Sequence, residues 1–269
     1  MNGLLANRTL FSFGEGRPPK RTPLRSAAQG VWFPERFAAA CQASVSEATS
    51  VTIRDAGGEH LWPVADVHCA SFYPNAGFLI SPLIKMDRLM SMMDGQEYQA
   101  STRGRFCCLI ALGETVEELP APPFPYSALQ PFFPKDVGRG LGAPHDSCGV
   151  LGAIIMDDTG EHLPSMHSKV NGKTLWKREK GCAYLSNLAV SPCMRGQGIG
   201  KKLVKEAEQI AKEWGCWGAA LHCDRTNVPA FKLYTGEGYV RPKDQDSGDY
   251  RSLSTGHQRG GCDLLVKLL

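Results

Sequence analysis

The most restrictive part of the sequence is residues 184–200, where a strand pattern passes through a glycine-rich turn into the clearest helix of the chain. Ala183–Val190 is predicted as a strand, and Pro192 prevents it from continuing in the middle of a sheet. Glycines follow at positions 196, 198 and 200. Apolar residues recur at intervals of three and four from Ile199 to Trp214, which predicts an amphipathic helix. The chain must therefore turn sharply from a strand into a helix.

A glycine turn that opens a helix is a candidate anion site. Glycine lets the backbone adopt positive φ and approach a ligand closely, and the helix N-terminus presents unpaired N–H groups and the positive end of the dipole. Neither familiar nucleotide motif is present. The dinucleotide fingerprint needs glycine where Lys201 stands, and the P-loop needs another glycine spacing and a hydroxyl where Lys202 stands. The glycines alone leave a structural turn and a phosphate site equally open.

The rest of the pattern predicts an α/β (α+β) chain. The predicted strands are Val51–Arg54, Arg105–Leu112, Gly149–Asp157, Ala183–Val190, Ala219–Cys223 and Cys262–Leu269. The predicted helices are His60–Phe72, Leu83–Gln99, Ile199–Trp214 and Asn227–Tyr234. Strands follow one another first and alternate with helices later, which predicts a mixed sheet with helices on both faces.

Two stretches are predicted as irregular insertions into one domain of residues 49–269. Six prolines crowd the segment between positions 120 and 134, so 113–147 is expected to be a loop or flap rather than a helix or central strand. Residues 158–181 are polar and basic, and a hairpin excursion is expected there. In the helix at 83–99, the apolar residues at helical spacing are expected in the core; they are Leu83, Met86, Leu89, Met90 and Met93.

The net charge is too small to indicate nucleic-acid binding, with 30 Lys and Arg against 27 Asp and Glu. The apolar runs are too short to cross a bilayer, so no membrane partner is expected. The whole excess of +3 lies in residues 1–50. Residues 1–48 are basic, hydroxylated and acid-poor without a signal-peptide apolar core, which predicts an organellar transit peptide, plastid before mitochondrial. The alternative is a solvated tail on a cytoplasmic protein.

The ten cysteines predict neither a metal centre nor a disulfide scaffold. No two of them form a C-x-x-C pair, and the histidines are not spaced around them as zinc ligands. Most are expected to be small buried apolar residues.

Three motifs in one register resemble a known family. Leu188-Ala-Val-x-Pro-x-x-Arg-Gly-Gln-Gly-Ile-Gly200 is similar to the acetyl-CoA signature of the GNAT (N-acetyltransferase) superfamily. Leu221-His-Cys-Asp is similar to the family's next strand, and Asn227 to Tyr239 resembles its Asn-x-x-Ala-x-x-Leu-Tyr-x-x-x-Gly-Phe helix. The firm part covers about residues 182–240 and looks nearest to plant-type plastid members. The resemblance implies a GNAT-like, mostly antiparallel central sheet flanked by helices.

The resemblance also implies acetyl-CoA as co-substrate, with no metal. The pantetheine arm would be bound by backbone groups along the strand, at Leu188, Ala189 and Val190. The pyrophosphate would be enclosed by the turn, which consists of Arg195, Gly196, Gln197, Gly198, Ile199, Gly200 and Lys201. The pantetheine would also be held by the start of the next helix, at Asn227, Val228 and Pro229. Asn227 is also a good N-cap, and it could serve in both ways.

Acetyl transfer from a thioester to an amine needs an acid, an oxyanion site and a proton acceptor. By resemblance Tyr234 would be the proton donor to the leaving thiolate. Backbone N–H groups at a bulged or splayed strand can stabilise the oxyanion. Many relatives place a Glu before the signature, but here the sequence reads Tyr-Leu-Ser-Asn. His222 with Tyr184, acting through water, is the candidate base, and proton loss to bulk water is the alternative.

These inferences predict an N-acetyltransferase whose acceptors are protein amines, the α-amines of N-termini first and lysine ε-amines as further ones. A small amine, such as a polyamine or arylalkylamine, is the alternative acceptor. A non-catalytic acyl-CoA-binding module is the alternative outside enzymes.

Overall fold

The computed structural model describes residues 50–101, 104–113, 121–159, 169–170, 173–174, 181–242 and 261–269. The predicted transit peptide lies outside these residues. Among the helices that are described, none is both long and apolar enough to cross a membrane.

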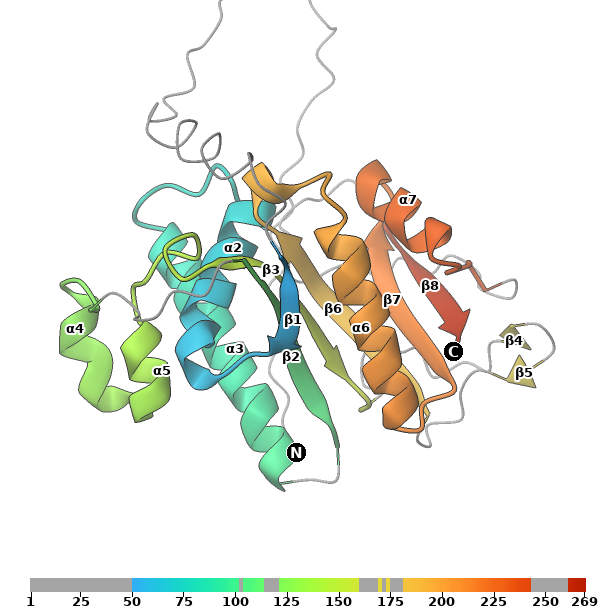
Figure 1. The fold of residues 1–269 in the computed structure, drawn as a ribbon, viewed down its shortest axis with the longest axis horizontal. Coiled ribbons are helices and arrows are strands. Elements are labelled where there is room, and N and C mark those ends of the chain that lie inside the picture. Colours follow the sequence, from blue (N-terminus) through green and yellow to red (C-terminus); the bar gives the residue numbers. More distant parts are fainter. Residues whose placement is uncertain are drawn as a thin grey trace, which may run out of the picture. The chain divides into compact units, whose positions relative to one another are not determined.

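A six-stranded sheet in the order β1-β2-β3-β6-β7-β8 forms the centre of the domain (Figure 1). Its strands are β1 (Thr52–Asp55), β2 (Phe106–Leu112), β3 (Val150–Asp157), β6 (Cys182–Val190), β7 (Gly218–Asp224) and β8 (Cys262–Leu268). All neighbours are antiparallel except β6 and β7, which are parallel. The predicted mixed α/β fold is confirmed.

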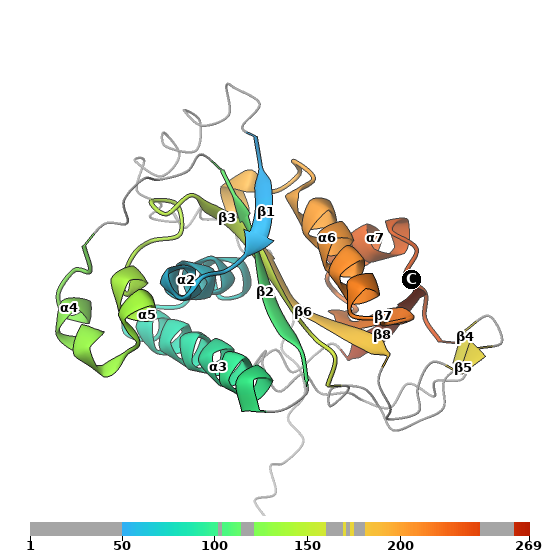
Figure 2. The ribbon, with the colours of Figure 1, turned by 60° about the horizontal axis from the view of Figure 1, so that its bottom comes forward.

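Helices cover both faces of this sheet, as Figure 2 shows. One face carries α2 (Leu61–Phe72), preceded by the 3-10 turn η1 (Gly58–His60), together with α3 (Ser81–Ser101) and α5 (Lys135–Gly140). The other carries α6 (Ile199–Glu213) and α7 (Val228–Gly236). Each face has its own apolar core, so the middle strands β2 and β3 are buried on both sides and are apolar almost throughout.

The helix α6 forms as its apolar periodicity requires, because Ile199, Leu203 and Ala207 are all buried against the sheet. In α3 the expected apolar stripe is only partly right. Leu89 is fully buried, but Leu83 and Met90 are 70% and 44% exposed, which corrects the expectation that both lie in the core. The helix turns its other side to the sheet and buries Met92 instead.

The stretch 113–147, expected to be irregular, contains short helices where it is described. These are α4 (Tyr126–Leu129), the 3-10 turn η2 (Gln130–Phe132) and α5. The prolines do not prevent them, because Pro125 and Pro134 are N-cap residues and Pro131 lies in a first turn, where the N–H has no helical partner. In 158–181, two-residue strands β4 (Lys169–Val170) and β5 (Lys173–Thr174) pair with each other.

Candidate active site

The strands β6 and β7 separate halfway along their length. They pair only from Cys182 opposite Gly218 to Tyr184 opposite Ala220, although β6 continues to Val190. Beyond Tyr184, most side chains of β6 change from buried to partly exposed. The sheet therefore opens into a gap beside the second half of β6.

A β-bulge lies on β6 at the start of this gap. The pairing of β6 with β3 shifts between Ser186 opposite Ile155 and Ala189 opposite Ala153. Asn187 in this bulge has φ of 53°, the one non-glycine residue with positive φ among those described. Bulges redirect strand groups and often lie next to active sites, which matches the expected place of an oxyanion site.

The peptide groups of Val190 point into the gap. Ser191 N donates to Leu151 O at 2.8 Å, so Gly152 and Val190, which lie opposite each other, are a non-hydrogen-bonded pair of the antiparallel ladder. The N–H and C=O of Val190 therefore face away from β3, where an extended ligand could add as a further strand.

The Val190 carbonyl already has protein partners. It accepts a hydrogen bond from Ser71 Oγ at 3.0 Å and from Arg195 Nε at 3.3 Å. Arg195 Nη2 also donates to the Ser71 carbonyl at 3.4 Å. The exposed Arg195 side chain thus ties the turn to the end of β6 and to α2, a positioning role that the sequence did not predict.

The turn into α6 has the backbone expected of an anion site. Gly196 and Gly198 both have φ of 79°, and a Cβ at either position would meet nothing within 4 Å. Gly198 is the N-cap of α6, and within the described part of the chain no side chain caps the N–H groups of its first turn. These N–H groups and the helix dipole can therefore serve an anion.

Two members of the predicted cradle have other contacts. A Cβ at Gly200 would lie 3.4 Å from Leu233 and 3.7 Å from Val190, which is ordinary van der Waals contact, so Gly200 faces the packed side of α6 towards β6 and α7. Lys201 Nζ forms an ion pair with Glu237 Oε1 at 2.7 Å. Its ammonium is therefore directed towards α7, and its backbone N–H is the group left for an anion.

Tyr184, on the last residue pair between β6 and β7, lies beside His222, which is two residues beyond that pair on β7. Tyr184 Oη and His222 Nδ1 are 2.9 Å apart, and their ring centroids are separated by 5.7 Å. Tyr184 lies on β6 beside the opening, so the pair stands at the point where the strands separate.

Tyr234 projects from α7 into the core beneath the gap and is 8% exposed. Its ring packs edge-on against Tyr239, with centroids 5.9 Å apart. Burial, with the nearby Cys223 and Tyr184, raises the pKa of the Tyr234 hydroxyl. The hydroxyl is therefore protonated at neutral pH and can act as an acid.

Asn227 acts as an N-cap, as its position suggested. Its Oδ1 accepts from Ala230 N at 3.2 Å, and Pro229 stands in the first turn of α7. Val228 is 54% exposed. Asn227 is exposed, and the cap uses its amide oxygen rather than its amide nitrogen.

His68 is a residue of this region that sequence reasoning missed. It lies in α2, 5% exposed, and its pKa is lowered to about 3 by burial and by the charge of Arg88, while a hydrogen bond with Asn187 acts in the opposite direction. A neutral His68 thus supports the bulge from below. The local sequence signal for this region was Asn187 in the bulge, because asparagine is enriched at positive φ.

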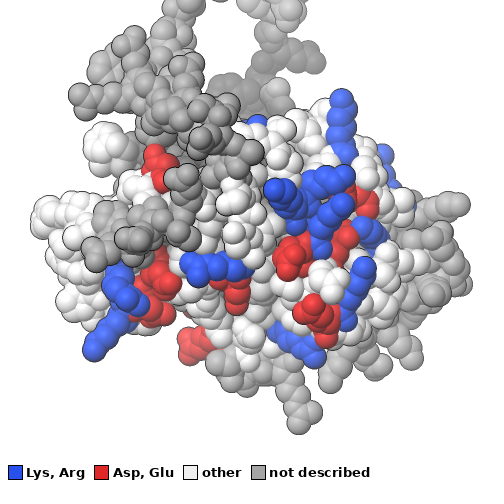
Figure 3. Space-filling view, viewed as in Figure 1, with Lys and Arg blue, Asp and Glu red and all other residues white. Residues whose placement is uncertain are grey.

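Acidic and basic side chains are mixed on the face of the domain that α6 covers. Figure 3 shows basic side chains gathered near the beginning of α6 with acidic ones beside them. Anion binding is therefore a local property of the turn rather than of a broad basic surface.

The comparison with known families decides the assignment. Residues 113–239 match the profile of the acetyltransferase (GNAT) family. The chain belongs to this GNAT family. The resemblance seen in the motifs of residues 188–239 is thus confirmed.

Individual relatives agree. GCN5-related N-acetyltransferase 4, chloroplastic, of Arabidopsis thaliana is 33% identical over 192 residues, which cover 70% of this chain and 60% of that protein. N-alpha-acetyltransferase 30 of Homo sapiens is 42% identical over 60 residues, 22% of this chain and 17% of that protein. The chain therefore spans less than two thirds of either GNAT relative.

A solved structure supports the fold. An Acinetobacter baylyi protein described as an acetyltransferase aligns over 83% of this chain and 94% of its own, with a TM-score of 0.50 and 14% identity. At this identity the likeness concerns the GNAT fold alone.

Proposed function

We propose that this GNAT protein is an acetyl-CoA-dependent N-acetyltransferase that acts on protein amines. The observation that carries the proposal is the opening between β6 and β7, which leads from the Tyr184–His222 pair to the uncapped turn of α6. One continuous edge thus offers groups for an acyl donor and for proton transfer.

The residues at this edge fit acetyl-CoA in order. The N–H groups of the turn from Arg195 to Lys201 would bind the pyrophosphate. Leu188, Ala189 and Val190 would bind the pantetheine arm through the backbone, with the Asn227 amide at the other side of the gap. Acetyl-CoA supplies an acetyl group activated as a thioester.

The proton steps fall to three side chains. Tyr234 donates the proton of its hydroxyl to the departing thiolate. Burial raises the pKa of this hydroxyl, which keeps it protonated at neutral pH but makes it a weaker acid than an ordinary tyrosine. The acceptor amine is protonated at neutral pH and must first lose a proton. Tyr184 and His222, hydrogen-bonded to each other, receive it through water. The bulge at Asn187 directs backbone groups to the developing oxyanion.

The relatives favour a protein acceptor. N-alpha-acetyltransferase 30, which matches 60 residues of this chain, has a name that denotes acetylation of α-amines. We propose N-terminal α-amines as the main acceptors and lysine ε-amines as further ones. The name of the Arabidopsis relative supports a plastid location for this chain too.

The test is to incubate the full chain with acetyl-CoA and a peptide library and to measure free CoA and acetylated peptides. Acetylation of peptide α-amines, with slower modification of lysines, is the expected result. Turnover with polyamines or arylalkylamines but with no peptide would replace the acceptor class. Acetyl-CoA binding without turnover on any amine would make the protein a binding module instead.

A further inference from the structure

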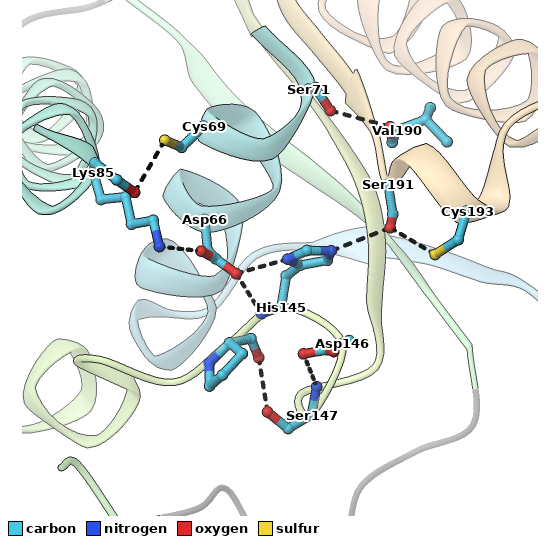
Figure 4. Close-up of polar contacts among 12 residues, drawn as sticks. Asp66, Cys69, Ser71, Lys85, His145, Asp146, Ser147, Val190, Ser191 and Cys193 are labelled. Carbon is cyan, nitrogen blue, oxygen red and sulfur yellow. Dashed lines mark hydrogen bonds and ion pairs between the residues drawn. The ribbon is translucent and has the colours of Figure 1, made fainter. Parts of the chain in front are cut away.

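A second polar constellation lies on the face of the sheet that α2 covers, opposite to Tyr234. Asp66 of α2, His145 of the loop before β3 and Ser191 after β6 form a hydrogen-bonded row that ends at Cys193 of η3 (Pro192–Met194) (Figure 4). His145 Nδ1 lies 2.6 Å from Asp66 Oδ2, and His145 Nε2 lies 3.1 Å from Ser191 Oγ. Ser191 Oγ lies 3.2 Å from Cys193 Sγ.

The charge of Asp66 fixes the hydrogens in this row. Burial opposes ionisation of Asp66, but the hydrogen bond with His145 and the Lys85 ammonium, 2.5 Å away, lower its pKa to about 2. An ionised carboxylate only accepts hydrogen bonds, so His145 Nδ1 carries a proton. The backbone N of His145 donates to the same carboxylate oxygen at 2.9 Å, which holds the ring in place.

Two proton arrangements then satisfy every partner. In a neutral His145 ring, Nε2 is an acceptor, so Ser191 donates to it and accepts from the Cys193 thiol. After transfer, the protonated ring donates to Ser191, and Ser191 donates to a Cys193 thiolate. The passage between them moves two protons by one bond each and leaves no buried group of the row without a partner.

Exposure separates Cys193 from the other cysteines of the described residues, which are buried or, in the case of Cys262, partly exposed. The hydrogen-bonded residues behind Cys193 are buried, with His145 7% and Ser191 3% exposed. Burial raises the pKa of Cys216 and of Cys223 to about 11, which keeps these two thiols protonated. Only the thiolate is nucleophilic, so the row ends in a thiol that reagents can reach and whose proton has an acceptor.

We propose that Cys193 is a modification site at which the Asp66–His145–Ser191 row promotes thiol–disulfide exchange with small disulfides. The Cys193 proton passes to Ser191 Oγ as the Ser191 proton passes to His145 Nε2. The thiolate attacks one sulfur of the disulfide, a new S–S bond forms, and the old one breaks. The other half leaves as a thiolate, so Cys193 is oxidised and half of the reagent is reduced. Exposed Arg195, two residues away, favours an anionic reagent.

The test uses the full chain with oxidised glutathione at about pH 6, where ordinary thiols are protonated. Peptide mass spectrometry follows the mixed disulfide at Cys193 and at Cys262, a partly exposed thiol whose pKa is raised by burial. We expect Cys193 to react roughly tenfold faster than Cys262, and the adduct to be removed by a reductant.

Variants then test the row itself. Ser191→Ala and His145→Gln should each slow the reaction of Cys193 roughly tenfold, because neither can pass the proton on. The matched control is Ser147→Ala, since the exposed Ser147 lies in the same loop and its hydroxyl donates to the Pro144 carbonyl; it should react as the wild type. Circular dichroism and thermal unfolding identify a variant that fails to fold.

Two results would overturn the proposal. One is equal reaction of Cys193 and Cys262 in the wild type, and the other is an unchanged Cys193 rate in folded Ser191→Ala or His145→Gln. The readout is the disulfide at Cys193, so the outcome does not depend on whether the protein transfers acetyl groups.

Discussion

The two halves of β6 carry different tasks although they belong to one strand. In the buried half from Cys182 to Leu185, the residues up to Tyr184 pair with β7, and Tyr184 and Leu185 pair with β3. The half from Ser186 to Val190 pairs with β3 alone and is mostly part-exposed. The first half is core, and the second presents backbone groups to a gap. A strand can therefore hold a fold together at one end and bind a ligand at the other, provided that its neighbour diverges.

The largest expected effect is on the rate of acetyl transfer beside the second half of β6, from Ser186 to Val190. Tyr234→Phe should lower the turnover number by about a hundredfold or more, the usual contribution of an acid, with acetyl-CoA affinity unchanged. Turnover is measured by CoA release and affinity by calorimetry. Tyr239→Phe is the matched control, because its ring lies 5.9 Å from that of Tyr234. Equal activity of the two variants would remove Tyr234 as the acid.

A pair of leucines tests the contrast within β6 directly. Leu185, 3% exposed, lies in the first half, and Leu188, part-exposed, in the second. Leu185→Ala should lower the free energy of unfolding by about 2–5 kcal/mol through the cavity it leaves. Leu188→Ala should cost about 1 kcal/mol, because less apolar area is lost. Urea unfolding measures both, and equal losses would contradict the contrast.

The turn after the open half is tested by two glycines of one backbone conformation. Gly198 and Gly215 have φ of 79° and 77° at the two ends of α6, with nothing within 4 Å of an added Cβ. Valine at either position should strain the backbone by about 1–3 kcal/mol. Only Gly198→Val should also weaken acetyl-CoA binding, by about tenfold or more. Equal affinity of the two variants would place the cofactor elsewhere.

The smallest expected effect is a pH dependence of the free energy of unfolding, caused by His68 beneath the bulge of β6. His68 has a pKa lowered from 6.5 to about 3, by burial first, so the unfolded chain binds its proton at a higher pH than the folded one does. Stability from neutral His68 is present in full above pH 6.5 and falls as pH decreases towards 3. At about pH 5 the loss is about 2 kcal/mol.

In His68→Leu this part of the pH dependence should disappear. Urea unfolding at several pH values compares the variant with the wild type. An unchanged slope between pH 6.5 and 5 would show that His68 is not the group responsible.

Local sequence was enough to predict most elements. The period of α6 and the proline after β6 are local signals, and the predicted ends of the strands and helices lie close to those observed. The Asn227 cap was also predictable, because capping involves residues three positions apart. The expectation that the prolines of 113–147 exclude helices was wrong, because the effect of a proline depends on its position within a turn. The core side of α3 was predicted only in part, because several sides of this helix are apolar.

The sequence by itself predicted the strand–turn–helix that can hold an anion, the GNAT family and candidate residues for acid and base. Only the tertiary structure decided that β7 leaves β6 at Tyr184, that Arg195 and Lys201 have protein partners, and that Asp66, His145, Ser191 and Cys193 meet. The physical reason is range. Periodicity and capping act within one element, whereas a hydrogen bond between Asp66 and His145 joins residues 79 positions apart, and no local pattern records it.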